Sequence, residues 1–96
     1  TGVSLDSTRN ILYMSDSGNH VIRALNQTSG TITIVAGTPS VAGFSGDGGL
    51  ATSASLNNPT NLLFDEGKNW LYVSDTDNHR VRLLDLSTGI ISTVVG

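Results

Sequence analysis

The sequence contains one stretch of residues twice, and this repeat constrains the fold more than any other feature. Residues 3–37 align with residues 62–96 without a gap, at an offset of 59 positions, and 14 of the 35 aligned residues are identical. The agreement is densest where the segment that begins at Tyr13 returns at Tyr72. Self-similarity at a period of this size is typical of solenoids, propellers and arrays, in which each unit packs on its neighbours. A repeated unit rarely carries a unique catalytic constellation, so the repeat favours a structural or binding role.

Each repeat predicts four short β-strands. The segments are rich in β-branched and aromatic residues, and turn-forming residues separate them. The predicted strands cover residues 3–5, 11–15, 21–25, 31–35, 62–64, 70–74, 80–84 and 90–95. No segment has a convincing apolar period of about 3.6 residues, so we expect almost no helix beyond a single turn within 49–56. The pattern therefore predicts an all-β chain.

Six residues at equivalent positions of the two repeats are interpreted as structural turn residues. Asp and Asn side chains bond nearby backbone N–H groups, and glycine supplies the left-handed residue of a bulged hairpin loop. A polar rim that each repeat presents to a ligand is the alternative interpretation of the Asp and Asn pair. The six residues are Asp16, Asn19 and Gly30 in the first repeat and Asp75, Asn78 and Gly89 in the second.

The strand predicted at residues 70–74 begins with four apolar residues in succession. An apolar run of this kind indicates a strand that is covered on both faces. We therefore expect Trp70 to lie between stacked sheets, and Trp70→Ala to lower the free energy of unfolding by about 3–5 kcal/mol.

Residues 38–61 interrupt the repeat and connect the last strand of one unit to the first strand of the next. Connections of this length are uncommon in compact domains and are often functional. The apolar residues in this segment predict that it folds back onto the sheets. They are Val41, Phe44, Leu50 and Leu56.

The glycine-rich part of this connection, residues 43–49, fits no catalytic or phosphate-binding motif. A nucleophile elbow needs glycine where Asp47 stands, a phosphate loop needs a lysine, and the order of the calcium nonapeptide is not matched. We interpret the glycines as permitting a compact loop. Phe44 and Asp47 are the candidate binding residues of this loop.

Arg23 and Arg82 occupy equivalent positions and are the other two candidate binding residues, for an anion or a partner's carboxylate. The alternative is an ion pair with Asp16 or Asp75 of a neighbouring unit. Zinc needs several ligands at short distances, so for the duplicated histidines, His20 and His79, we favour packing or hydrogen bonding to the turn. The sequence predicts no catalytic residues, no metal site and no cofactor.

Composition narrows the classes of partner. The net charge is −3 with only five basic residues, too few for a basic patch, so we expect no nucleic-acid partner. No apolar run reaches the 18 or so residues of a membrane span. Asn26 begins an Asn-Gln-Thr sequence that fits the N-glycosylation pattern. This acceptor, scarce lysine and abundant Ser and Thr favour an extracellular or secreted protein.

The second repeat resembles a known family. The sequence Leu71-Tyr72-Val73-Ser74-Asp75-Thr76-Asp77-Asn78-His79-Arg80-Val81-Arg82 resembles the core of an NHL repeat. The stretch 42–54, followed by Leu56-Asn57-Asn58-Pro59, is similar to the inter-repeat loop of a long-repeat branch of that family. NHL repeats form β-propellers, commonly six-bladed, with four antiparallel strands in each blade. The resemblance implies a first blade over 1–37, a long inter-blade loop over 38–61 and a second blade over 62–96.

The resemblance also implies a class of function. A non-enzymatic interaction or scaffold module would bind a protein or a glycan through loops on the propeller faces. The alternative is a part of a propeller enzyme of the lyase or lactonase type, with a metal in the central channel supplied largely by other blades. Two blades cannot close a ring of about four to eight. The expected partners are therefore other blades, in a longer chain or in a self-assembled homo-oligomer, in which three copies would give six blades.

Overall fold

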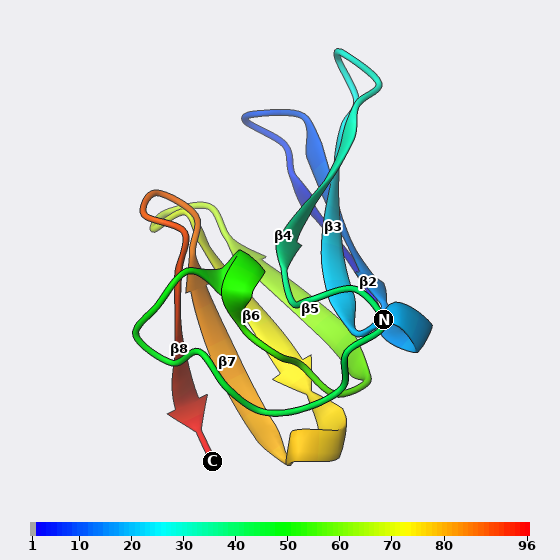
Figure 1. The fold of residues 1–96 in the computed structure, drawn as a ribbon. Coiled ribbons are helices and arrows are strands. Elements are labelled where there is room, and N and C mark those ends of the chain that lie inside the picture. Colours follow the sequence, from blue (N-terminus) through cyan, green and yellow to red (C-terminus); the bar gives the residue numbers. More distant parts are fainter. Residues whose placement is uncertain (1) are drawn as a thin grey trace.

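The computed structural model describes residues 2–96 and contains two four-stranded antiparallel β-sheets (Figure 1). In each sheet the strands lie side by side in chain order. The two sheets confirm the all-β prediction. Blade 1 consists of β1 (Val3–Asp6), β2 (Ile11–Asp16), β3 (Val21–Asn26) and β4 (Ile32–Ala36). Blade 2 consists of β5 (Pro59–Asp65), β6 (Trp70–Asp75), β7 (Arg80–Asp85) and β8 (Ile90–Val95).

One strand begins earlier than the sequence predicts. β5 starts at Pro59, inside the segment 38–61 that was assigned to the inter-blade loop. Its register shifts between the pair Pro59–Asp75 and the pair Leu62–Val73, so the two ends of β5 are separated by an irregularity. Proline cannot donate a ladder hydrogen bond and is confined to edge strands, strand starts and bulges. The first paired residue of β5 therefore looked like loop in the sequence. We refer below to residues 38–58 as the linker.

Helix is confined to three single 3₁₀ turns: η1 (Ser17–Asn19), η2 (Ala51–Ser53) and η3 (Thr76–Asn78). The turn expected within 49–56 is thus confirmed as η2. The other two occupy the β2–β3 and β6–β7 connections, and each ends on a histidine in the left-handed region, His20 and His79. Within residues 2–96, none of these helices is long enough or apolar enough to cross a membrane.

The β3–β4 and β7–β8 hairpins each contain the left-handed glycine that the sequence predicts. Gly30 and Gly89 have φ angles of 79° and 76°, so both are left-handed. In the first hairpin the Asn26 carboxamide oxygen accepts hydrogen bonds from the Thr28 and Ser29 backbone N–H groups. The glycosylation candidate Asn26 therefore holds its own turn, at the exposed end of β3, and its modification stays a prediction.

The core lies between the two blades and is completed by the linker. The Tyr13 ring stacks on the Phe64 ring of the other blade, with centroids 5.7 Å apart. Burial, followed by the nearby Asp6 charge, raises the pKa of the Tyr13 hydroxyl above its usual range. The buried residues that pack together in this core are Tyr13, Ile22, Ala24, Ala36, Ala51, Ala54, Leu56, Phe64, Leu71, Val73, Leu84 and Ile91.

Each blade has one covered and one open face. Leu71 and Val73 are fully buried beneath blade 1 and the linker, and Trp70 and Tyr72 alternate with them along β6. Successive side chains of a strand point to opposite faces. Trp70 therefore lies on the far face of blade 2, half-buried, with the Lys68 ammonium 4.7 Å from its ring centroid. The expectation that Trp70 lies between the blades of this chain is wrong, because blade 1 covers the Leu71 face.

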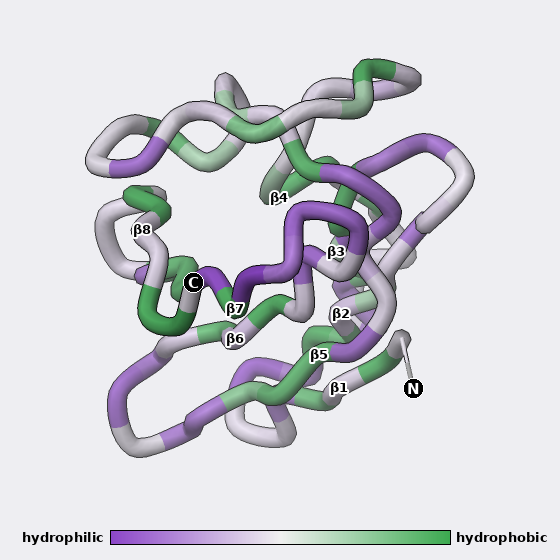
Figure 2. The backbone as a smooth tube through the Cα atoms, turned by 90° about the horizontal axis from the view of Figure 1, so that it is seen from below, coloured by the Kyte–Doolittle hydropathy of each residue, from purple (hydrophilic) through white to green (hydrophobic). Residues whose placement is uncertain are grey.

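The linker crosses the covered face of blade 2, as the green segment in Figure 1 shows, and η2 lies beside β4. Leu56 is fully buried, which confirms that the linker folds back onto the sheets. The other three apolar residues that led to this prediction are exposed: Val41, Phe44 and Leu50. Their place in the core is taken by Ala51 and Ala54. In Figure 2 the hydrophobic segments follow the strands, and the turns are mostly hydrophilic.

Candidate functional site

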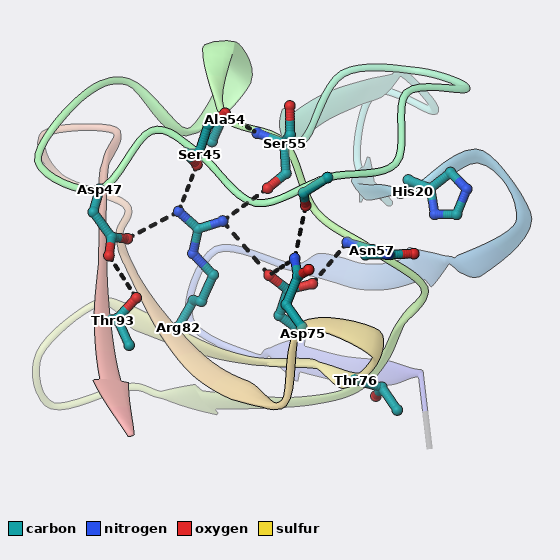
Figure 3. Close-up of polar contacts among 12 residues, drawn as sticks. His20, Ser45, Asp47, Ala54, Ser55, Asn57, Asp75, Thr76, Arg82 and Thr93 are labelled. Carbon is teal, nitrogen blue, oxygen red and sulfur yellow. Dashed lines mark hydrogen bonds and ion pairs between the residues drawn. The ribbon is translucent and has the colours of Figure 1, made fainter. Parts of the chain in front are cut away.

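The side chain that organises the linker is Arg82 on β7, and it is fully buried (Figure 3). Its Nη1 donates to the Ser55 carbonyl at 2.9 Å, and its Nη2 donates to the Ser45 carbonyl at 2.8 Å. Nη2 also donates to Asp47 Oδ1 at 2.9 Å, and Nη1 lies 3.6 Å from Asp75 Oδ2. One guanidinium thus joins two distant parts of the linker to blade 2. Arg82 was predicted as a ligand-binding residue, but its burial leaves it no surface for a partner.

Asp75 and Asn78 hold the end of the same loop. The buried Asp75 carboxylate accepts from the Asn57 N–H at 2.7 Å through Oδ1 and from Asn78 Nδ2 at 2.9 Å through Oδ2. Asn78 Nδ2 also donates to the Gly43 carbonyl at 2.7 Å. The pair therefore spans its own turn, as the structural interpretation predicts. It also contacts the linker, which the sequence did not indicate.

Asp47 ties the linker to two strands. Its Oδ1 accepts from Arg82 on β7, and its Oδ2 accepts from the Thr93 hydroxyl on β8 at 2.6 Å. Burial acts to raise the pKa of Asp47, but the hydrogen bonds from Thr93 and Arg82 outweigh it and lower the pKa below its usual range. The carboxylate is thus kept ionised as an anchor, with 38% of the side chain exposed.

Two glycines allow the linker to lie this close to itself. Gly46 and Gly48 have φ angles of 95° and 82°, in the left-handed region that favours glycine. A Cβ on Gly46 would lie 2.5 Å from the Ala54 Cβ, so no side chain fits there. This confirms the interpretation of the glycine-rich segment as a compact loop.

Phe44 is the aromatic side chain that this fixed loop presents at the surface. The residue is 42% exposed. The Arg80 guanidinium carbon lies 4.3 Å from its centroid and that of Arg82 lies 4.8 Å away. Guanidinium groups at these distances are attracted by the ring quadrupole. Phe44 is therefore held in place by two cations while part of its ring faces solvent.

Blade 1 carries the same three polar residues in a simpler arrangement. Arg23 Nε donates to Asp16 Oδ2 at 3.0 Å, and Asn19 Nδ2 donates to the same oxygen at 2.9 Å. These bonds, from Asn19 first and then Arg23, lower the pKa of Asp16. Arg23 and Asp16 each have 33% of the side chain exposed. Both arginines pair with an Asp of their own blade, so the expected pairing with a neighbouring blade is wrong: the β2–β3 and β6–β7 ladders bring the partners together within one sheet.

The side chains of the two histidines have different surroundings. His20 Nδ1 accepts from the Asn58 backbone N–H at 2.9 Å, which places the β2–β3 turn against the end of the linker. His79 is exposed. Within residues 2–96, no three His, Cys, Asp or Glu side chains are grouped closely enough to hold a metal ion.

The sequence did not single out Arg80 or Thr93, although both contact the candidate residues Phe44 and Asp47. A signal for Arg80 was present. The equivalent residue of the first repeat is Val21, so Arg80 is a place where the second repeat departs from the first beside an otherwise identical Asn-His pair. Thr93 corresponds to Ile34 and shows the same kind of departure. The two blades therefore differ where blade 2 receives the linker.

Known proteins are similar to this sequence over nearly its whole length. NHL repeat-containing protein 2 of Bos taurus is 37% identical over 91 residues, which cover 95% of this chain and 12% of that protein. The Homo sapiens protein of the same name is 37% identical over 98 residues, which cover 97% of the chain and 12% of that protein. The chain belongs to the NHL-repeat family. It spans about an eighth of the length of these NHL relatives, and no protein-family model matches it.

Two crystal structures have the same fold. An auxiliary nutrient binding protein from Bacteroides thetaiotaomicron superposes with a TM-score of 0.75 at 19% identity, over 98% of this chain and 25% of that chain. The auxiliary nutrient binding protein from Bacteroides ovatus superposes with a TM-score of 0.74 at 26% identity, over the same shares of the two chains. The NHL pair thus has the blade arrangement of propeller-like proteins.

Proposed function

We propose that this NHL pair is part of a non-enzymatic β-propeller module that binds a protein or glycan partner through its linker face. The linker is held by a buried guanidinium, two carboxylates and an asparagine. A loop fixed in this way loses little conformational entropy when a partner binds, and such preorganisation raises affinity. The fold likeness to two proteins named as nutrient binding supports a binding role. An extracellular location is part of the same proposal.

The observation that carries the proposal is the Phe44–Arg80 pair at the surface of the fixed loop. An aromatic ring provides apolar area at low entropic cost, and aromatic and arginine side chains are prominent among residues that dominate binding energy. Arg80 takes part in none of the ion pairs found within residues 2–96, although Asp47 and Asp75 lie in the same region. The chemistry of the pair favours a partner that places an apolar or sugar-ring surface on Phe44 and an acidic group beside Arg80.

The test is to select ligands for the chain and then remove the two side chains. The probes are a random-peptide phage library and a glycan array, each exposed to the immobilised or labelled 96-residue chain. For selected ligands we expect Phe44→Ala and Arg80→Gln each to weaken binding about tenfold or more, since interface residues of this kind contribute more than about 1 kcal/mol.

Two controls distinguish this surface from other apolar surfaces. Val41→Ala removes another exposed apolar side chain of the linker, and Leu63→Ala removes one from the open face of blade 2. Neither is expected to change binding of the selected ligands. Ligands that bind Phe44→Ala and Arg80→Gln as tightly as the original chain would contradict the proposal.

A further inference from the structure

The duplicated Asp-Asn-Arg set offers a comparison inside one chain. In blade 2, Arg82, Asp75 and Asn78 bond the linker through the Ser45, Ser55 and Gly43 carbonyls, the Asn57 N–H and the Asp47 carboxylate. Figure 3 shows how Arg82 lies at the centre of this arrangement, between Asp47 on one side and Asp75 on the other. In blade 2, the Asp-Asn-Arg set therefore binds a loop.

Blade 1 carries the same set, and within residues 2–96 the linker contacts this set only at Asn19. The Asn19 side-chain oxygen accepts from the Ser40 hydroxyl at 3.4 Å, and its backbone carbonyl accepts from the Ser40 N–H at 2.8 Å. Arg23 uses Nε for Asp16, and within residues 2–96 its two terminal nitrogens, Nη1 and Nη2, make no hydrogen bond. These are the nitrogens that correspond to the loop-binding nitrogens of Arg82. Asn19 bonds Asp16 through Nδ2, as Asn78 bonds Asp75, but Nδ2 reaches no loop carbonyl. Within the described residues 2–96, Asp16 accepts no backbone N–H of the kind that Asn57 donates to Asp75.

The apolar surroundings repeat as well. Leu12, Met14 and Leu25 share the face of Arg23 and correspond to Leu71, Val73 and Leu84 around Arg82. The blade 2 residues are buried, whereas those of blade 1 are only half-buried. Val3 and Leu5 extend the same face onto β1 and are exposed. Blade 1 thus presents an apolar surface with a partly exposed ion pair, and this combination is covered in blade 2.

We propose that the Asp16–Asn19–Arg23 set is a docking site for a second loop of the linker's type, supplied by a neighbouring blade. The occupant is a glycine-rich loop that offers two backbone carbonyls and one carboxylate to Arg23, as residues 45, 55 and 47 do for Arg82. It approaches from the side that leads into β1, because the linker leads into β5 in blade 2. The site is separate from the Phe44–Arg80 surface, and the proposal does not depend on the function proposed above.

The experiment builds this loop into the chain. A second copy of residues 38–59 is fused ahead of Thr1, so that its proline precedes Thr1 as Pro59 precedes Thr60 in the repeat. We expect the extension to raise the thermal unfolding midpoint by about 4–8 °C, a shift that modest added stability gives in a domain of this size. Arg23→Ala, or replacement by asparagine of the appended aspartate that corresponds to Asp47, is expected to remove most of that gain.

The decisive quantity is the coupling between the two changes. In a double-mutant cycle, groups in contact give non-additive effects, and groups that do not interact give additive ones. Arg23→Ala is therefore measured with and without the extension, alongside Arg9→Ala, which removes an exposed arginine from the opposite turn. Arg9→Ala is expected to cost the same in both chains.

Further variants keep the result interpretable. If Arg23→Ala does not fold, Arg23→Lys keeps the charge, removes the fork that bonds two carbonyls, and is expected to lose part of the gain. Asp47→Asn in the original linker tests whether the added loop acts by displacing that linker. The rise in the unfolding midpoint that the extension gives is expected to persist in this variant. An extension that leaves the midpoint unchanged, or a gain that is equally large without Arg23, would overturn the proposal.

Discussion

Arg23 and Arg82 have the same side chain in the same strand position and very different surroundings. Arg82 is fully buried among carbonyls and carboxylates, whereas Arg23 is one-third exposed and bonds only Asp16. Removing one partner of a buried ion pair leaves an uncompensated charge, but an exposed ion pair contributes little. Chemical identity alone therefore does not set the energetic role of either arginine.

This difference gives a direct prediction. Arg82→Ala is expected to lower the free energy of unfolding by about 3–5 kcal/mol, because Asp75 stays buried without its cation. Arg23→Ala is expected to cost less than about 1 kcal/mol. Urea denaturation of the two variants measures both values, and similar costs would contradict the different energetic roles assigned to Arg82 and Arg23.

The ionised Asp47 predicts a dependence of stability on pH. Its pKa is lower in the folded chain than in the unfolded one, so its contribution is present above the titration range of an unfolded aspartate. That contribution is lost as the pH falls below about 4. Thermal melts from neutral to acid pH are expected to fall less steeply for Asp47→Asn than for the original chain. Asp16 also has a lowered pKa, so part of the loss of stability at acid pH remains in both proteins. Parallel curves for the two proteins would show that Asp47 does not contribute to this loss.

At the scale of elements, the linker depends on one backbone conformation. Gly46→Ala places a methyl group against Ala54 and forces an alanine into a positive φ, so we expect it to cost more than about 1 kcal/mol. Gly18→Ala is the matched control, because a Cβ there meets nothing within 4 Å and its φ is not positive. Chemical denaturation compares the two, and equal stability would mean that the linker tolerates another path.

The strands and turns were predictable because their signals are local. Alternating β-branched residues, paired Asx residues and Gly30 or Gly89 specify a hairpin from a few neighbouring positions. The linker contacts were not, since Arg82 meets carbonyls 27 and 37 residues away and carbonyl groups carry no sequence signal. The position of Trp70 failed for a related reason: an apolar run indicates two covered faces but does not say which blade covers each.

At the scale of the whole molecule, the open face of blade 2 is equivalent to the face of blade 1 that blade 2 covers. The far face of blade 2 exposes Leu63, at 63%, beside Trp70 and Tyr72. The equivalent face of blade 1 is covered by blade 2, through contacts such as Tyr13 on Phe64. A further blade can therefore be added to either end by repeating the contact already present.

We expect the isolated chain to self-associate through these faces. Light scattering after size exclusion is expected to give about three times the chain mass of 10.0 kDa if three copies close one six-bladed ring. Leu63→Asp, which puts a charge on the open face of blade 2, is expected to return the mass to that of one chain. A monomer at every concentration would contradict self-association and favour blades supplied by a longer chain.

The bonds from Arg82, Asp75 and Asn78 also decide where the chain can be divided. Because residues 43–57 are bonded mainly to β6, β7 and β8, a cut just after Gly37 leaves blade 2 with its anchoring partners. A cut just before Pro59 removes the linker partners of Arg82, Asp75 and Asn78, which are buried or half-buried polar side chains. The structural unit that could be transplanted into another propeller is therefore residues 38–96, a loop followed by its sheet, and not the sheet alone.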